Sequence, residues 1–429
     1  MSFRSMSPTS RQISPLTIAL AGMIALATAM GIGRFAFTPL MPMMLHDGVI
    51  DLLRASWLAT ANYIGYLVGA LICTFQPWLW RRFPGLPEVA PLIWVRSGLF
   101  ATGLLTLGMA LNLPALWPLL RFLAGVASAF VFLYTSGWCL AQLARQNASG
   151  MGGAIYAGPG AGIALSGLMC SGMVVLQWKA STGWIIMGVA AFILTAIVWR
   201  TFDPGNEKPV ANAAAGQGTV AASAPSTAAA VAVGSRNQMI ALSLAYGLAG
   251  LGYIVTATFL PVIARQALPG SPFLDMFWPM LGLGVFTGAL LSTRVPLTGD
   301  LRYLLAGCYF IQALAIAISL WSPTLPGFVI GSFVLGIPFT ALTFFGMQEV
   351  RRLRPDNATS YMGLLTAVYG VGQIAGPPMV AVMLRRTATV EAGFTLSLEI
   401  AAGALVLGAL MYLCMVRVWP MPAPGRDRA

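Results

Sequence analysis

Twelve long apolar stretches constrain this chain more than any other feature of its sequence. They cover approximately residues 16–45, 55–76, 90–111, 115–144, 152–176, 182–200, 237–264, 274–294, 302–321, 327–349, 361–384 and 393–416. A helix needs ~20 predominantly apolar residues to cross the hydrocarbon core of a bilayer, and these stretches are about that long or longer. They predict an all-α membrane protein with twelve transmembrane helices.

The scarcity of charge indicates the same class. Hydrophobic residues make up 58% of the chain and charged residues only 8%, whereas an ordinary soluble domain carries roughly 25% charged residues. So few charged groups cannot cover a surface in water. We therefore expect the lipid bilayer to surround most of the chain, and we expect the first stretch to be a retained span, because it is far longer than the apolar region of a signal peptide.

The reactive residues exclude several functions. The net charge of +12 comes mostly from arginines that stand singly or in pairs between apolar stretches, which suits topology-setting loops better than a nucleic-acid surface. The five cysteines all lie inside apolar stretches, and His46 is the single histidine. No metal-ligand spacing and no nucleophile–base set is present. We predict no enzyme, no metal, no cofactor and no nucleic-acid partner.

The distribution of basic residues predicts the orientation. If the N-terminus is cytoplasmic, most Lys and Arg residues fall on the cytoplasmic side, as the positive-inside rule requires. The exceptions on the outer side are Arg54, Lys179, Arg265, Arg385 and Arg386. We therefore predict that both termini lie in the cytoplasm. We also expect a monomeric, multi-pass protein of the bacterial inner membrane.

A low-complexity segment divides the twelve stretches into six and six. Between Asp203 and Arg236 the chain is rich in Ala, Gly, Ser and Pro and poor in large apolar groups, as a flexible linker is. We predict an N-terminal six-helix bundle over residues 1–200, a cytoplasmic linker over 201–236 and a C-terminal six-helix bundle over 237–429.

The two halves also resemble each other in sequence. The first stretch reads GIGRFAFTPLMP from Gly31, and the seventh reads GLGYIVTATFLP from Gly250, so that equivalent residues are 219 positions apart (250 − 31 = 219). The same offset relates Gly65 and Gly69 of the second stretch to Gly284 and Gly288 of the eighth. Two bundles in the same orientation form a parallel repeat, as in transporters that work by rocking.

These residues resemble a known family. Nearly the whole chain resembles the major facilitator superfamily, and GIGRFAFTPLMPMM from Gly31 resembles the signature of its YbfB/YjiJ-type branch. The segment from Arg121 to Gly125 resembles the family's intramembrane R-x-x-x-G motif, and this resemblance implies a part in proton coupling. Gly158 and Pro159 begin a segment similar to a Gly-Pro motif of exporters, but Gly162-Ile163 replaces the two adjacent glycines of that motif.

Arg34 is the main candidate for a functional residue. At ~1.5 Å per residue it lies about 20 Å from Asp47, near the middle of the first stretch, where a charge costs about 3 kcal/mol. It must face a cavity, a counter-charge or an anionic substrate, unless it is a structural arginine bound to helix-end carbonyls. Arg121 is a second candidate, either for coupling or for a bond between helices. Glu399 is the one carboxylate candidate for proton coupling, or else an interface residue.

Polar residues at helical spacing complete a candidate site between the two halves. Each could instead bond only to a neighbouring helix. The predicted substrate-binding set is Arg34, Thr38, Asn62, Tyr66, Tyr246, Tyr253, Tyr369 and Gln373; the predicted coupling or gating set is Arg121, Gly158, Pro159 and Glu399.

The sequence thus predicts a secondary transporter of a small polar or anionic solute that works by alternating access. The resemblance implies that protons drive it. The alternative within transport is a broad-specificity drug or metabolite exporter, which the many methionines and aromatic residues favour. A receptor or scaffold is the alternative from another class, but no loop is long enough and apolar enough to hold a soluble module.

Overall fold

The structure, a computed structural model, is helical throughout the residues that it describes. These are residues 13–83, 85, 89–206, 235–267, 276–296, 299–355 and 358–421, and they contain no strand. Most of the predicted linker, residues 207–234, lies outside the described residues.

The helices follow the predicted stretches closely. They are α1 (Pro15–Leu26), the π-helix η1 (Ala27–Arg34), α2 (Phe37–His46), α3 (Leu52–Arg82), α4 (Pro91–Gly108), α5 (Trp117–Arg145), η2 (Ser149–Met151), α6 (Gly152–Ile155), α7 (Gly158–Val175), α8 (Ala180–Val198), η3 (Pro204–Asn206), α9 (Arg236–Ala267), α10 (Phe277–Ser292), α11 (Leu301–Trp321), α12 (Leu325–Gly336), α13 (Pro338–Leu353), α14 (Ala358–Arg386) and α15 (Val390–Val418).

Eleven helical segments among the described residues are long and apolar enough to cross a membrane. They confirm a multi-pass membrane protein. The predicted stretch 274–294 corresponds to the shorter apolar helix α10, of 16 residues. At ~1.5 Å per residue such a helix spans about 24 Å, less than the ~30 Å hydrocarbon core.

Several predicted spans are interrupted, and the residues at each break explain why. In the first span the amide of Phe35 bonds to the carbonyl of Met30, five residues earlier, so the backbone takes π geometry beside Gly31 and Gly33. In the tenth, Pro338 begins a new helix directly after Ile337. Proline lacks the N–H that would continue the ladder, and its ring clashes with the preceding turn.

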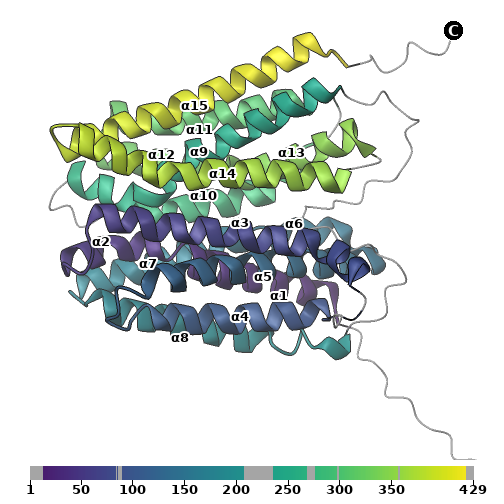
Figure 1. Ribbon diagram of the computed structural model, residues 1–429, viewed down its shortest axis with the longest axis horizontal. Coiled ribbons are helices and arrows are strands. Elements are labelled where there is room, and N and C mark those ends of the chain that lie inside the picture. Colours follow the sequence, from purple (N-terminus) through teal and green to yellow (C-terminus); the bar gives the residue numbers. More distant parts are fainter. Residues whose placement is uncertain are drawn as a thin grey trace, which may run out of the picture.

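Figure 1 draws the helices in two groups that lie side by side. Helices α1–α8 form the N-terminal group, and α9–α15 form the C-terminal group. The two groups meet where α7 packs on α10, α3 on α14 and α2 on α9.

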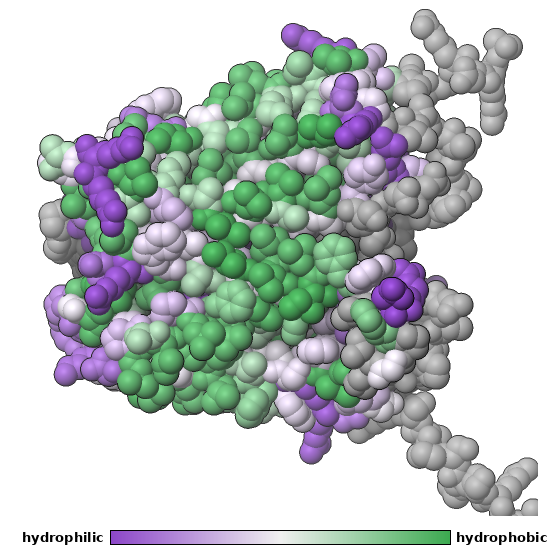
Figure 2. All heavy atoms as spheres, viewed as in Figure 1, coloured by the Kyte–Doolittle hydropathy of each residue, from purple (hydrophilic) through white to green (hydrophobic). Residues whose placement is uncertain are grey.

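The surface has the polarity that a bilayer requires. Figure 2 shows an apolar band across the middle of the molecule, with hydrophilic residues gathered toward the two ends of the helices. Large apolar side chains such as Phe310, Ile197 and Val175 are exposed on the outside of the groups. In water such a surface would be unfavourable, whereas in lipid it costs nothing.

Glycines allow equivalent helices of the two groups to cross closely. A Cβ atom on Gly65 of α3 would overlap the carbonyl oxygen of Phe122 in α5, and one on Gly284 of α10 would overlap that of Phe333 in α12. The glycines four residues further along each helix repeat the contact one turn on. These pairs are Gly69 with Val126 and Gly288 with Ile337.

We expect Gly65→Ala to lower the thermal stability of the detergent-solubilised protein, by about 1–3 kcal/mol, because the added methyl group meets rigid backbone. Gly403→Ala on α15 is the control, since a Cβ there meets no atom within 4 Å, and alanine favours a helix over glycine. Equal melting temperatures for the two variants would contradict this packing.

Candidate functional site

A cavity of about 220 Å³ lies between the two groups. Its walls come from η1, α3, α5, α6 and α7 on one side and from α9, α10, α13 and α14 on the other. It begins near Arg34 and Gln373 and extends to Gly150 and Thr293, which are exposed at one end of the molecule. At the other end Thr38 and Thr258 are buried where α2 packs on α9. Among the described residues, the cavity therefore reaches the exposed surface at the end marked by Gly150 and Thr293.

Arg34 is the single charged side chain among the described residues that line this cavity. Only 4% of it is exposed. Its Nη2 donates to Oε1 of Gln373 in α14 at 2.7 Å, and its guanidinium carbon lies 4.0 Å from the ring centre of Tyr66 in α3. No hydrogen-bond acceptor contacts its Nε. The guanidinium is thus bound by a neutral amide and an aromatic face, without a carboxylate.

Gln373 connects the two groups. Its amide oxygen accepts from Arg34, and its amide nitrogen donates to the hydroxyl of Tyr253 in α9. Arg34 and Tyr253 occupy equivalent positions of the internal repeat (253 − 34 = 219). The Gln373 side chain therefore joins the repeat-related residues Arg34 and Tyr253 at the end of the cavity where these residues lie.

A second bond joins a repeat-related pair directly. Thr38 donates its hydroxyl to the carbonyl of Ala257 at 3.1 Å, and these residues are also 219 positions apart. A residue that contacts its own repeat equivalent must lie near the axis that relates the two groups. This bond joins the two groups at the start of α2, one turn beyond Arg34.

Arg121 supports the backbone beneath Arg34. Its Nη1 and Nη2 donate to the carbonyls of Gly33 and Arg34, at 3.2 and 2.9 Å, and Asn62 donates to the carbonyl of Arg121 itself at 2.9 Å. Backbone groups inside a membrane must find internal partners. Arg121 thus satisfies carbonyls next to the π-turn and is a positioning residue for Arg34.

The structure brings together most of the predicted binding residues. Those that line the cavity are Arg34, Tyr66, Tyr246, Tyr253, Tyr369 and Gln373, and Pro159 of the predicted coupling or gating set lines it too. The others lie elsewhere: Thr38 and Asn62 bond at helix crossings, Arg121 lies behind η1, Gly158 packs on the carbonyl of Met23, and Glu399 is exposed on α15. The binding and coupling roles of all twelve stay predictions.

Sequence reasoning missed the contribution of α13. Phe339, Thr340 and Thr343 line the cavity opposite η1. The two threonines are three residues apart and follow Pro338. Polar residues at helical spacing beside a helix break could therefore have identified this part of the cavity from the sequence.

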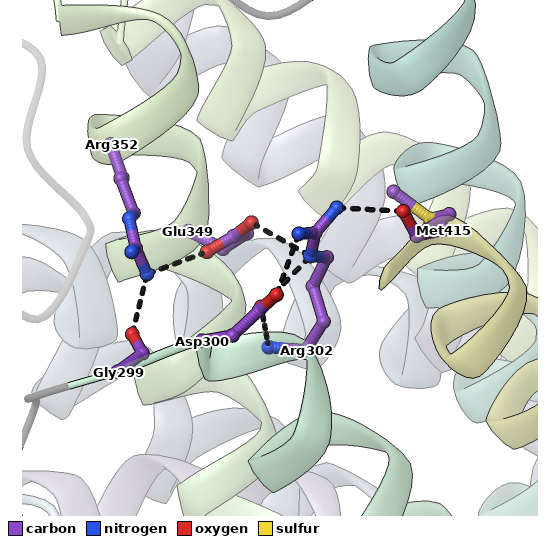
Figure 3. Close-up of polar contacts among 6 residues, drawn as sticks. All are labelled: Gly299, Asp300, Arg302, Glu349, Arg352 and Met415. Atoms are coloured by element: carbon purple, nitrogen blue, oxygen red, sulfur yellow. Dashed lines mark hydrogen bonds and ion pairs between the residues drawn. The ribbon is translucent and has the colours of Figure 1, made fainter. Parts of the chain in front are cut away.

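A second polar cluster lies at the open end of the C-terminal group (Figure 3). Arg302, at the start of α11, is fully buried; it binds Asp300 at 2.6 Å and the carbonyl of Met415 at 2.9 Å, and lies 3.8 Å from Glu349. Arg352 lies 3.9 Å from Glu349 on its other side. The cluster ties the beginning of α11 to the ends of α13 and α15.

Asp300 precedes the membrane-spanning part of α11 and caps that helix. Partial burial favours its neutral form, but hydrogen bonds from the Arg302 side chain and backbone outweigh burial and lower its pKa below the ordinary 3.8. A carboxylate with a lowered pKa stabilises the fold above its unfolded pKa, and that contribution is lost as the pH falls through the folded pKa.

We expect Arg302→Ala to destabilise the protein by about 3 kcal/mol or more, because it leaves Asp300 and the buried Glu349 without their shared cation. Thermal unfolding in detergent measures the loss. Arg417→Ala, at an exposed position on α15, is the control and should change little.

Asp300→Asn should also lower the melting temperature near neutral pH, and the deficit should shrink as the pH is taken below 3.8, where the wild-type carboxylate begins to protonate. Glu399→Gln, at an exposed position, should show no such convergence with wild type. A deficit that stays constant with pH would exclude a role for the Asp300 charge.

No group of three or more metal-ligating side chains gathers anywhere in the part of the chain that the structure describes.

Comparison with known proteins identifies one family. A family model described as "Uncharacterised MFS-type transporter YbfB" matches residues 26–413, a range that includes every helix that lines the cavity. No curated protein matches the chain.

Proposed function

The chain belongs to the family of YbfB-type transporters of the major facilitator superfamily, and on this premise we propose that it carries a small polar or anionic solute by alternating access. Membership of the family implies membrane transport. In the proposed mechanism, two six-helix bundles over residues 1–200 and 237–429 rock about the cavity between them. The linker 201–236 tethers the bundles, and no catalytic reaction is involved.

Three observations support this architecture. The helices separate into two groups. Repeat-related glycines make equivalent crossings in both groups. Thr38 bonds to its own repeat equivalent, Ala257. All three are expected of two similar bundles related by an axis along the membrane normal, with α10 as the eighth of twelve membrane helices.

The distribution of Lys and Arg supports cytoplasmic termini, and the proposed location is the bacterial inner membrane. In that orientation, Gly150 and Thr293 lie on the cytoplasmic side. The structure then corresponds to an inward-open state, in which the bond from Thr38 to Ala257 and the contact of Tyr63 with Thr258 at 2.8 Å close the outer side.

The observation that carries the choice of solute is the buried Arg34 guanidinium, which faces the cavity and has no carboxylate partner. A solute that accepts hydrogen bonds or carries negative charge supplies what this site lacks. An exporter of broad specificity is the second candidate, because Met30, Phe132 and Met347 make part of the lining apolar.

Proton coupling is part of the proposal on grounds of the family. Glu399 is exposed on the outside of α15, and Glu349 lies in the cluster of Arg302, so neither carboxylate lines the cavity. If coupling occurs, collapsing an imposed pH gradient across proteoliposomes should reduce solute accumulation.

Alternating access predicts that the central cavity opens to the cytoplasmic side in one state and to the outer side in the other. In a background without native cysteines, Thr343→Cys in the cavity should react with a membrane-impermeant thiol reagent from the cytoplasmic side. Thr258→Cys, buried at the closed end, should react only from the outside, and only as the carrier visits the opposite state.

Arg145→Cys and Arg54→Cys serve as markers for the inner and the outer side, because both positions are exposed. Their labelling also tests the orientation of the termini. Reaction of Thr343→Cys and Thr258→Cys from the same side would refute alternating access for this chain.

A further inference from the structure

We infer that the cavity binds an organic monocarboxylate with an aromatic body. This inference rests on the proposed function and narrows its solute class. Three features of the described residues support it. They are the charge of the lining, the Nε–H group of Arg34 that has no hydrogen-bond acceptor, and a wall of aromatic side chains near that guanidinium.

The charge of the lining favours a single negative charge on the ligand. Arg34 is the one charged group among the described residues of the wall, and no ion pair neutralises it. Arg121, the nearest other cation, directs its Nη1 and Nη2 at the carbonyls of Gly33 and Arg34 and does not line the cavity. A buried cation without a partner is unfavourable. A monoanion supplies the one countercharge that the wall lacks, whereas the second charge of a dianion would find no cation on the wall itself.

The geometry of Arg34 favours a carboxylate. A guanidinium binds a carboxylate through two parallel N–H groups, and here Nη2 is bonded to a neutral oxygen while the neighbouring Nε has no partner. Oε1 of Gln373, 2.7 Å from Nη2, occupies a place that a carboxylate oxygen can take. Gln373 thus acts as a neutral placeholder, and an anion would exchange with it and also engage the free Nε.

The opposite wall favours an aromatic body. The rings of Tyr253 and Tyr369 lie nearly parallel, 15° apart, with centres 5.9 Å apart, and Phe339 meets Tyr253 edge-on at 4.9 Å. Tyr246 extends this wall, 5.1 Å from Tyr369. Since Gln373 bonds to both Arg34 and Tyr253, a carboxylate on Arg34 would leave its body against these rings, where aromatic groups pack with favourable geometry.

The test is a thermal-stability screen of the full-length protein in detergent. The probes are benzoate, phenylacetate and 4-hydroxybenzoate, with benzamide, benzylamine, phenyl phosphate and cyclohexanecarboxylate as matched compounds that change the charge or the ring. A ligand raises the melting temperature by binding the folded state, so at saturating concentration at least one aromatic acid should raise it by ~2 °C or more. The matched compounds should do so less. The inference would be overturned if any matched compound stabilised the protein as well as the best aromatic acid does. It would also be overturned if no aromatic acid raised the melting temperature.

Substitutions at one position provide the internal control. Gln373→Glu places a carboxylate beside Arg34 and should weaken binding of the acid by ~10-fold or more, because it supplies the charge that the ligand would bring. Gln373→Leu removes the placeholder without adding charge and should weaken binding of the acid much less than Gln373→Glu does. Arg34→Met should abolish it. Acid binding that survives in Arg34→Met, or that is equal in Gln373→Glu and Gln373→Leu, would contradict the assignment.

The two proposals fail in different ways. If a neutral or cationic solute protects Thr343→Cys from labelling while Thr258→Cys still becomes reactive from outside, transport stands and the carboxylate assignment falls. If aromatic acids bind but Thr258→Cys never reacts from outside, the binding site stands and alternating access falls.

Discussion

The need to satisfy polar groups inside an apolar medium governs this structure. The π-turn before Phe35 displaces backbone carbonyls from the regular ladder and turns Arg34 toward the cavity. Arg121 donates to two of the carbonyls beside that turn, and Gln373 accepts from Arg34 across the boundary between the groups. In water these bonds would each contribute little. In lipid every one left unmade is costly, so the bonds define where the first span bends and which way its charge points.

Close helix crossings make the arrangement possible. Within the N-terminal group, Gly31 of η1 meets Gly162 of α7 backbone to backbone, and between the groups Gly160 of α7 meets α10 in the same way. One helix is therefore packed tightly on both sides, and Pro159, directly before Gly160, lies on the cavity wall. The Gly-Pro segment of α7 acts here as a packing surface between the groups, and a side chain at its glycines would separate the elements that enclose the site.

Much of the fold followed from periodicity and composition, because length and apolarity suffice to identify a membrane helix. The family was also identifiable, since GIGRFAFTPLMP is a local signature that requires no contact information. The site was only partly predictable. Arg34 was conspicuous as a charge in an apolar stretch, but its partner Gln373 lies 339 positions away. The cluster of Arg302 was missed because Arg302 reads as an ordinary loop cation, and only folding brings Glu349 and the end of α15 to it.

By itself, the sequence determined the class of protein, the approximate helices and the internal repeat, since each depends on local composition or on a comparison of the chain with itself. Only the tertiary structure decided what Arg34 and Arg121 do. The sequence left a structural role open for both; the fold places Arg121 on backbone carbonyls and Arg34 in the cavity. Which of two similar charges reaches the cavity depends on which acceptors the neighbouring helices bring within reach, and that is a property of packing and not of either stretch alone.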